Sequence, residues 1–111
     1  MPMKMVQAIL RPEKIDEVKK ELEEGGFIAL TIIEVRGRGE QKGIKLEFRG
    51  TKMEVDLLPK AMIELVVKEE EVPKVIGIIR HSARTGKVGD GKIFILPVEK
   101  MLKVRTEEEW T

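Results

Sequence analysis

Hydrophobic and polar positions follow the same order in two parts of the chain. The segments Lys4–Leu22 and Ala61–Ile79 each open with an apolar, β-branched run and then change to apolar positions three and four residues apart. The first pattern is typical of a buried strand and the second of an amphipathic helix. Aligned without gaps, the two segments carry apolar residues at matching positions, such as Val18 and Val75. We therefore predict an internal repeat of one strand followed by one helix.

Signals at the ends of these segments extend the pattern to a whole domain. Pro12 suits the first turn of a helix, where its missing N–H group is not needed, and Gly25 and Gly26 end the first helix. Further strands are expected over Phe27–Arg36 and Lys92–Pro97. The resulting order, βαβ–βαβ, predicts a single α+β domain over residues 1–111 with a ferredoxin-like fold, in which both helices cover one face of a four-stranded sheet. Because its strands are so apolar, we expect neighbouring subunits to cover the other face.

The segment that joins the two halves is unusually long and rich in glycine. It runs over Gly37–Pro59, and four of the ten glycines lie between Gly37 and Gly50. Long connections in compact domains are uncommon unless they are functional or disordered. This segment is therefore the first candidate for function, and a solvated mobile insertion is the alternative.

Composition narrows the classes of function. The chain has 111 residues, of which 21 are basic and 20 acidic, and its formal net charge of +1 argues against nucleic acid or anionic lipid as the main partner. It has no Cys, which excludes disulfides, thiol catalysis and cysteine-ligated metals. The first residues show no secretory pattern, so we expect a cytoplasmic protein.

A glycine-rich turn is the sharpest local motif. Residues Gly86 to Lys92 read G-x-x-x-x-G-K, which nearly matches a phosphate-binding P-loop. However, Ile93 stands where that loop needs a hydroxyl, and the turn follows a helix and enters a strand, so we reject a Walker-type ATPase. The N–H groups of a glycine-rich turn can still bind an anion, with Lys87 or Lys92 adding charge. The alternative is a tight helix-to-strand connection.

A second glycine-rich stretch, Gly37–Gly43, has the spacing G-x-G-x-x-x-G, which is not the dinucleotide fingerprint. If the sheet brings the two stretches together, a polyphosphate could be reached by their glycines and by a set of polar and basic side chains: Gln41, Lys42, Lys60, Lys92, Lys103 and Arg105.

Other candidates are weaker. The only histidine, His81, is expected to be a solvated helix residue rather than a base or a ligand. RNA-recognition domains share the βαβ–βαβ order, but they need stacking aromatics, and this chain has no Tyr and three isolated Phe. The chain also lacks an evident catalytic base, which argues against an enzyme.

Taken together, several sequence blocks resemble the PII nitrogen-regulatory signal transducers of the GlnB/GlnK type. The most specific block is Thr85–Phe94, and the resemblance extends from Lys4 to about Thr106. The supporting blocks are Arg11–Lys14, Gly39–Gly43, Phe48–Gly50, Leu58–Lys60 and Lys103–Thr106.

The resemblance implies a homotrimer that signals rather than catalyses. Members of the family bind ATP or ADP in each cleft between subunits, and 2-oxoglutarate joins Mg-ATP there. A long T-loop, here about residues 38–54, projects to contact partners, and a carboxy-terminal loop covers about 105–111. The expected partner is an Amt-type ammonium transporter, with glutamine synthetase or nitrogenase as further candidates and no nucleic acid. Such a protein is cytoplasmic and reversibly associated with the membrane through the transporter.

The resemblance also assigns residues to the site. The adenosine end matches Ile9, Thr31, Glu64 and Val66, and the phosphates match Gly37, Gly39, Gln41, Lys42, Gly89, Gly91, Lys92, Lys103 and Arg105. By the same resemblance Gln41 is the Mg²⁺ ligand, and Gln41 and Lys60 contact 2-oxoglutarate. Arg49 matches the arginine that plugs the channel of the transporter.

The chain departs from the family pattern at several positions. Met53 replaces the tyrosine that is modified in the T-loop, so uridylylation or adenylylation cannot occur there. Lys103 replaces the usual arginine, which keeps the charge but loses the planar fork. Glu40 stands where many members have a basic or neutral residue. Two alternatives remain: a related trimer that senses adenylates or regulates nitrogenase, and an ATP- or acylphosphate-hydrolysing enzyme on the same fold.

Overall fold

The computed structural model describes residues 2–38, 44–48, 51–55 and 57–111. The elements within these ranges are β1 (Met3–Leu10), the short 3-10 helix η1 (Pro12–Lys14), α1 (Ile15–Glu24), β2 (Thr31–Gly37), β3 (Ile44–Phe48), β4 (Thr51–Val55), β5 (Leu58–Lys68), the 3-10 helix η2 (Glu69–Glu71), α2 (Val72–Ala83), β6 (Gly91–Val98), β7 (Met101–Leu102) and β8 (Glu109–Trp110). None of the helices in these ranges is long and apolar enough to cross a membrane.

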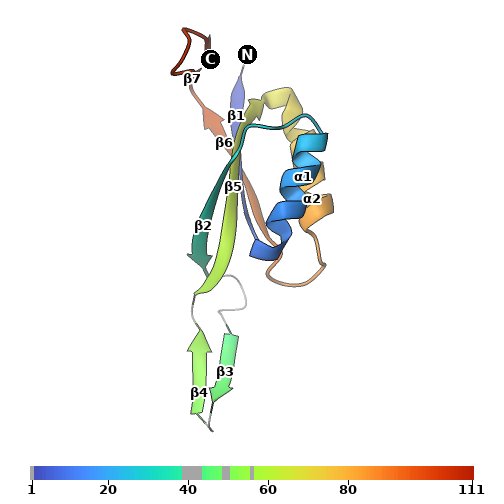
Figure 1. Ribbon diagram of the computed structural model, residues 1–111, viewed down its shortest axis with the longest axis vertical. Coiled ribbons are helices and arrows are strands. Elements are labelled where there is room, and N and C mark those ends of the chain that lie inside the picture. Colours follow the sequence, from blue (N-terminus) through green and yellow to red (C-terminus); the bar gives the residue numbers. More distant parts are fainter. Residues whose placement is uncertain (1, 39–43, 49–50, 56) are drawn as a thin grey trace.

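The main sheet has four antiparallel strands in the order β2-β5-β1-β6. Figure 1 shows α1 and α2 side by side on one face of this sheet, which confirms the predicted ferredoxin-like α+β fold. The central strand β1 fixes the register of its neighbours, because Met3 lies opposite both Lys68 and Val98, and Leu10 lies opposite both Ala61 and Gly91. The two ends of β1 therefore mark the two ends of the sheet.

The core lies between the sheet and the two helices. Every second residue of β1 and β5 faces the helices, and the apolar stripe of each helix packs on them, as the spacing predicts. Burial of each large aliphatic side chain contributes about 1.5–3 kcal/mol. The largest fully buried side chains are Val6, Val18, Leu22, Ile63, Val75, Ile79 and Ser82.

The other face of the sheet is open in the single chain. It carries the alternate residues of the strands, among them Ile33, Phe94 and Leu96, which remain 39%, 43% and 38% exposed. Large apolar side chains rarely gather on a free surface without a partner. The cover of this face by neighbouring subunits stays a prediction.

One predicted strand begins later than expected. The apolar run from Phe27 predicts a strand over Phe27–Arg36, but β2 begins at Thr31. The N–H group of Phe27 donates to the carbonyl of Leu22 at 2.8 Å, so this residue is tied to the last turn of α1, and its side chain is buried in the core. Ile28 is 75% exposed and lies in the connection. The strand expected over Lys92–Pro97 is confirmed and is one residue longer at each end.

Two hairpins that are separate from the main sheet lie beyond its opposite ends. Within the segment expected to be a long loop, β3 pairs with β4, and this hairpin projects beyond the end where β2 stops and β5 begins (Figure 1). At the opposite end, β7 pairs with β8, which places Met101 opposite Trp110. The carboxy-terminal loop predicted over 105–111 therefore contains a short strand.

Candidate functional site

The turn between α2 and β6 is organised by the carboxylate of Asp90. Its Oδ2 accepts the N–H groups of Thr85 and Gly86 at 2.9 and 2.8 Å. Its Oδ1 accepts the Thr85 hydroxyl and, at 3.2 Å, the Nε–H of Arg11. These donors favour the charged form, so the Thr85 hydroxyl first, and then the N–H groups and Arg11, hold the pKa of Asp90 well below its usual range.

Two cationic side chains from other parts of the chain hold the same turn. Arg11, which follows β1, donates from Nη2 to the carbonyl of Val88 at 2.9 Å. Lys60 on β5 donates from Nζ to the carbonyl of Gly89 at 3.1 Å. An ammonium group has three N–H donors, so within the described part of the chain Lys60 keeps two for a further acceptor. The turn is thus fixed from within by Asp90 and from the sheet by two cations.

Gly91 sits where the turn enters the sheet, and no other residue fits there. Its φ is +110°, in the region that side chains rarely adopt. A Cβ atom at this position would lie 1.9 Å from the carbonyl oxygen of Ile9 on the neighbouring strand. Gly89 also has a positive φ, +103°. The glycines therefore allow the turn to press closely against the end of β1.

A hollow of about 350 Å³ lies beside this turn. Of the described residues around it, Asp90 carries the only carboxylate, and its oxygens are already occupied. Arg38 and three lysines supply positive charge, and the charge of the hollow suits an anion. Six residues that the sequence assigns to the site lie here together: Ile9, Gly37, Lys60, Gly89, Gly91 and Lys92.

The candidates for the adenosine end lie along the open face of the sheet. Thr31 on β2 is directly opposite Glu64 on β5. The carboxylate of Glu64 accepts Nε2–H of Gln7 at 2.8 Å. Val66 follows on the same face of β5, opposite Met5. They form a track that leads away from the hollow toward the other end of the sheet.

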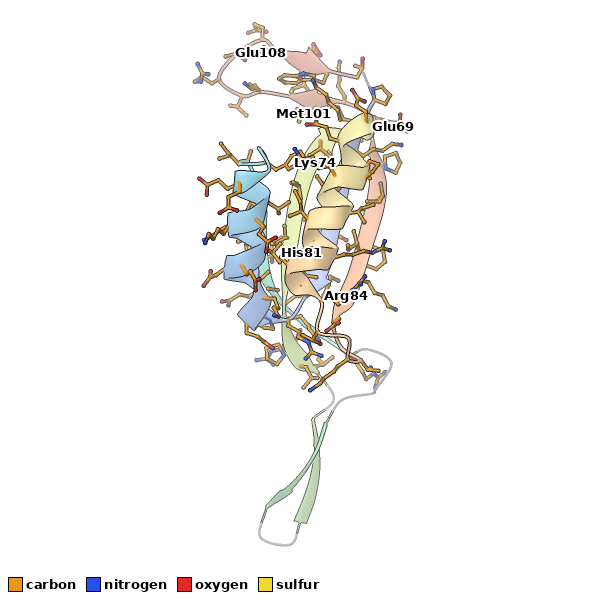
Figure 2. All side chains as sticks on the ribbon, turned by 90° about the vertical axis from the view of Figure 1, so that its right-hand side faces the viewer. Glu69, Lys74, His81, Arg84, Met101 and Glu108 are labelled. Carbon is orange, nitrogen blue, oxygen red and sulfur yellow. The ribbon has the colours of Figure 1, made fainter. Side chains whose placement is uncertain are left out.

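Lys103 and Arg105 lie at one end of the main sheet, and the glycine-rich turn lies at the other. They follow β7, whereas the turn precedes β6, and the eight residues of β6 separate the two. A strand rises about 3.3 Å per residue, so this separation exceeds about 20 Å, far beyond the reach of a lysine side chain. Figure 2 shows the same separation between Arg84, at the end of α2, and Glu108. Within one chain these two residues do not join the hollow.

Comparison with known proteins identifies the family. Residues 3–108 match the family described as "Nitrogen regulatory protein P-II". The chain belongs to this family. It is 51% identical over 106 residues to nitrogen regulatory protein P-II 2 of Methanothermobacter thermautotrophicus, covering 96% of this chain and 92% of that protein. It is 46% identical to the P-II protein of Pasteurella multocida, covering 96% of each.

A solved structure of a P-II protein agrees with this fold. The crystal structure of Arabidopsis thaliana PII bound to citrate superposes with a TM-score of 0.80 at 38% identity, covering 98% of this chain and 89% of that one. Membership of the P-II family makes this chain a nitrogen regulatory protein, not an enzyme.

Several predicted P-II site residues fall outside the described ranges. These are Gly39, Gln41, Lys42 and Arg49. Their roles remain predictions. His81 is confirmed as a solvated helix residue, with its side chain 82% exposed and its Nδ1 3.0 Å from Oε1 of Glu21.

Sequence reasoning missed two residues that shape the P-II site, Arg11 and Asp90. Asp90 had a local signal, because an aspartate between glycines in a turn can accept several backbone N–H groups. Arg11 stands in one of the sequence blocks that resemble the family, but its contact with Asp90 had no signal, because the two residues are 79 positions apart in the chain.

The lowered pKa of Asp90 predicts an acid-sensitive fold. An unfolded aspartate has a pKa of about 3.9, and the folded value is lower, so the contacts of Asp90 stabilise the protein fully above the unfolded pKa. This stabilisation is lost as the pH falls from there through the folded pKa. Thermal unfolding of the wild type and of Asp90→Asn, measured from about pH 6 to about pH 2, is expected to show a difference in Tm that shrinks below about pH 4. A difference that stays constant over this range would contradict the assignment.

Proposed function

We propose that this P-II protein is a sensor of energy and carbon status that binds ATP or ADP, and 2-oxoglutarate with Mg-ATP, in clefts between the subunits of a homotrimer. The observation that carries the proposal is the cationic hollow beside a turn rich in glycine and fixed at Asp90, Arg11 and Lys60. Backbone N–H groups and ammonium groups in such a place suit phosphate oxygens.

The homotrimer is supported by the positions of the basic residues, which lie at two opposite ends of the sheet. Lys103 and Arg105 cannot reach the glycine-rich turn of their own chain, since β6 lies between them. They can supply charge to phosphates at that turn only from a neighbouring chain. The exposed apolar residues of the open sheet face, such as Phe94, are consistent with the same assembly.

Within such a cleft each group has a chemical role. Gly37, Gly39, Gln41, Lys42, Gly89, Gly91 and Lys92 of one chain, with Lys103 and Arg105 of its neighbour, bind the phosphates, while Ile9, Thr31, Glu64 and Val66 hold the adenosine end. Gln41 supplies an oxygen ligand to Mg²⁺, which prefers such ligands. The two unused N–H donors of Lys60 suit a carboxylate of 2-oxoglutarate. Citrate, named with the Arabidopsis relative, is also a carboxylate.

The proposed signal is a shift between loop conformations. The γ-phosphate, Mg²⁺ and 2-oxoglutarate make contacts at the base of the T-loop (38–54) that ADP does not make. A ligand shifts a conformational equilibrium only by its difference in affinity for the two states. The T-loop then controls a partner, first an Amt-type ammonium transporter through Arg49, which associates a cytoplasmic protein reversibly with the membrane.

A calorimetric titration tests this function. 2-Oxoglutarate is titrated into the protein in the presence of Mg-ATP and, separately, of Mg-ADP. We expect binding with Mg-ATP only, because the γ-phosphate completes the Mg²⁺ site. Titrations in which the protein binds neither nucleotide nor 2-oxoglutarate would overturn the proposal. Binding of ATP without binding of 2-oxoglutarate would instead indicate a sensor of adenylates alone. The sequence feature that favours this second candidate is Lys103, which replaces the usual arginine of the family.

A further inference from the structure

The carboxy-terminal hairpin holds Lys103 between two side chains of its own chain. The Nζ atom of Lys103 lies 3.6 Å from Oε1 of Glu108 and 5.7 Å from the centre of the Trp110 ring. The backbone reinforces the arrangement, because the N–H group of Lys103 donates to the carbonyl of Glu108 at 3.1 Å. An ammonium group that the sequence assigns to phosphate binding is therefore already engaged.

The position of Glu108 is itself fixed by neighbouring contacts. Its Oε1 accepts the hydroxyl of Thr106 at 3.3 Å. Glu109, the next residue, forms an ion pair with Lys100 at 2.9 Å and begins β8. The Glu108 carboxylate is therefore held on the side of the hairpin where Lys103 lies.

We propose that Glu108 is an internal competitor that occupies the ammonium group of Lys103 until a phosphate displaces it, while Trp110 keeps that ammonium group in place. This inference rests on the proposed nucleotide-binding function and names its regulation. Glu108 is then a positioning residue, which acts on the ligand only through Lys103.

The energetics allow such an exchange. The side chains of Lys103 and Glu108 are 49% and 55% exposed, so their ion pair is weak and easily exchanged. A phosphate group offers more negative charge and more acceptor oxygens than a carboxylate. The identity of residue 103 also matters: the planar fork of an arginine binds a phosphate through two parallel hydrogen bonds, whereas the ammonium group of a lysine acts as a compact charge that a nearby carboxylate attracts as well.

The test compares Glu108→Gln with Glu107→Gln by calorimetric titration of Mg-ATP and of adenosine. Both variants remove one negative charge from the same hairpin, but in the described part of the chain Glu107 makes no ion pair or hydrogen bond through its side chain. The glutamine at 108 keeps an acceptor for Thr106. We expect Glu108→Gln to bind Mg-ATP about two- to fivefold more tightly than Glu107→Gln, the effect of releasing one exposed ion pair. Adenosine, which has no phosphate, should bind both variants equally.

A second readout comes from Trp110, the only tryptophan in the chain. Its emission should change when Mg-ATP binds the wild type, because the ammonium group over its ring acquires a new partner. Equal affinity of the two variants for Mg-ATP, or a gain that adenosine shares, would overturn the inference while leaving nucleotide binding intact. A wild type that binds no Mg-ATP would overturn the proposed function itself, and the inference with it.

Discussion

Replacement of Gly91 by alanine is expected to destabilise the protein by about 3 kcal/mol or more, a large share of the stability of a domain of this size. The new methyl group would lie 1.9 Å from the carbonyl oxygen of Ile9, which is a severe steric clash. Because both groups belong to paired backbone segments, the clash can be relieved only if β6 moves away from β1. The φ of +110° adds a second penalty for any residue with a Cβ atom. Urea unfolding followed by circular dichroism measures the loss as a lower midpoint.

The control for this variant is the same change at Gly77. This glycine lies in α2, and among the described residues no atom other than its chain neighbours and the backbone of its own helix lies within 4 Å of the position of its Cβ. Alanine is the better helix former, so Gly77→Ala should raise the free energy of unfolding by about 0.5–1 kcal/mol. If Gly91→Ala unfolded at the wild-type midpoint, the close approach of the turn to β1 would be wrong.

Replacement of Lys60 by methionine is expected to weaken 2-oxoglutarate binding by about tenfold to a hundredfold while Mg-ATP still binds. Methionine is unbranched and only one atom shorter than lysine, but it has neither the charge nor any of the three N–H donors. A hydrogen bond to a charged group contributes about 1.5–3 kcal/mol, which corresponds to this loss. Calorimetric titration of 2-oxoglutarate at saturating Mg-ATP measures it.

Lys87→Met is the matched control for Lys60→Met. Lys87 lines the same hollow, so its replacement removes the same charge from the same place. Lys60, however, is half-buried on β5 and points at the turn, whereas Lys87 is exposed. We expect the control to change 2-oxoglutarate affinity by less than about threefold, the effect of a screened surface charge. An equal loss in both variants would assign the effect to net charge and not to Lys60.

The fold could be predicted from the sequence largely because the period of the apolar residues changes cleanly between strand and helix. The repeat around Val18 and Val75 gave the two strand–helix units, and the structure confirms them. The start of β2 could not be predicted from the apolar run Phe27–Leu30. Such a run is compatible with a strand, but it is equally compatible with a connecting segment that buries one aromatic ring in the core. The β7–β8 hairpin was missed because a two-residue strand has no period to detect.

The site could be predicted only where its residues lie in continuous motifs. The glycines of the turn and Lys92 belong to one block of sequence, and they meet in one hollow. The bond between Arg11 and Asp90 joins residues far apart in the chain, and a single sequence holds no record of such a pairing. Nor can it tell that Lys103 lies at the other end of the sheet from the turn, because a motif gives the chemistry of a residue and not its place in the fold.

The hydrogen bonds that Asp90 accepts within the glycine-rich turn affect how the protein can discriminate between ligands. Since Thr85, Gly86 and Arg11 already hold this turn in one shape, a ligand loses little conformational entropy of the protein by docking there. In the proposed function, this preorganised turn offers the same rigid surface to every ligand that carries a phosphate. Discrimination between two nucleotides must then arise from parts of the protein that change conformation on binding. The turn itself keeps its conformation while those parts move relative to it.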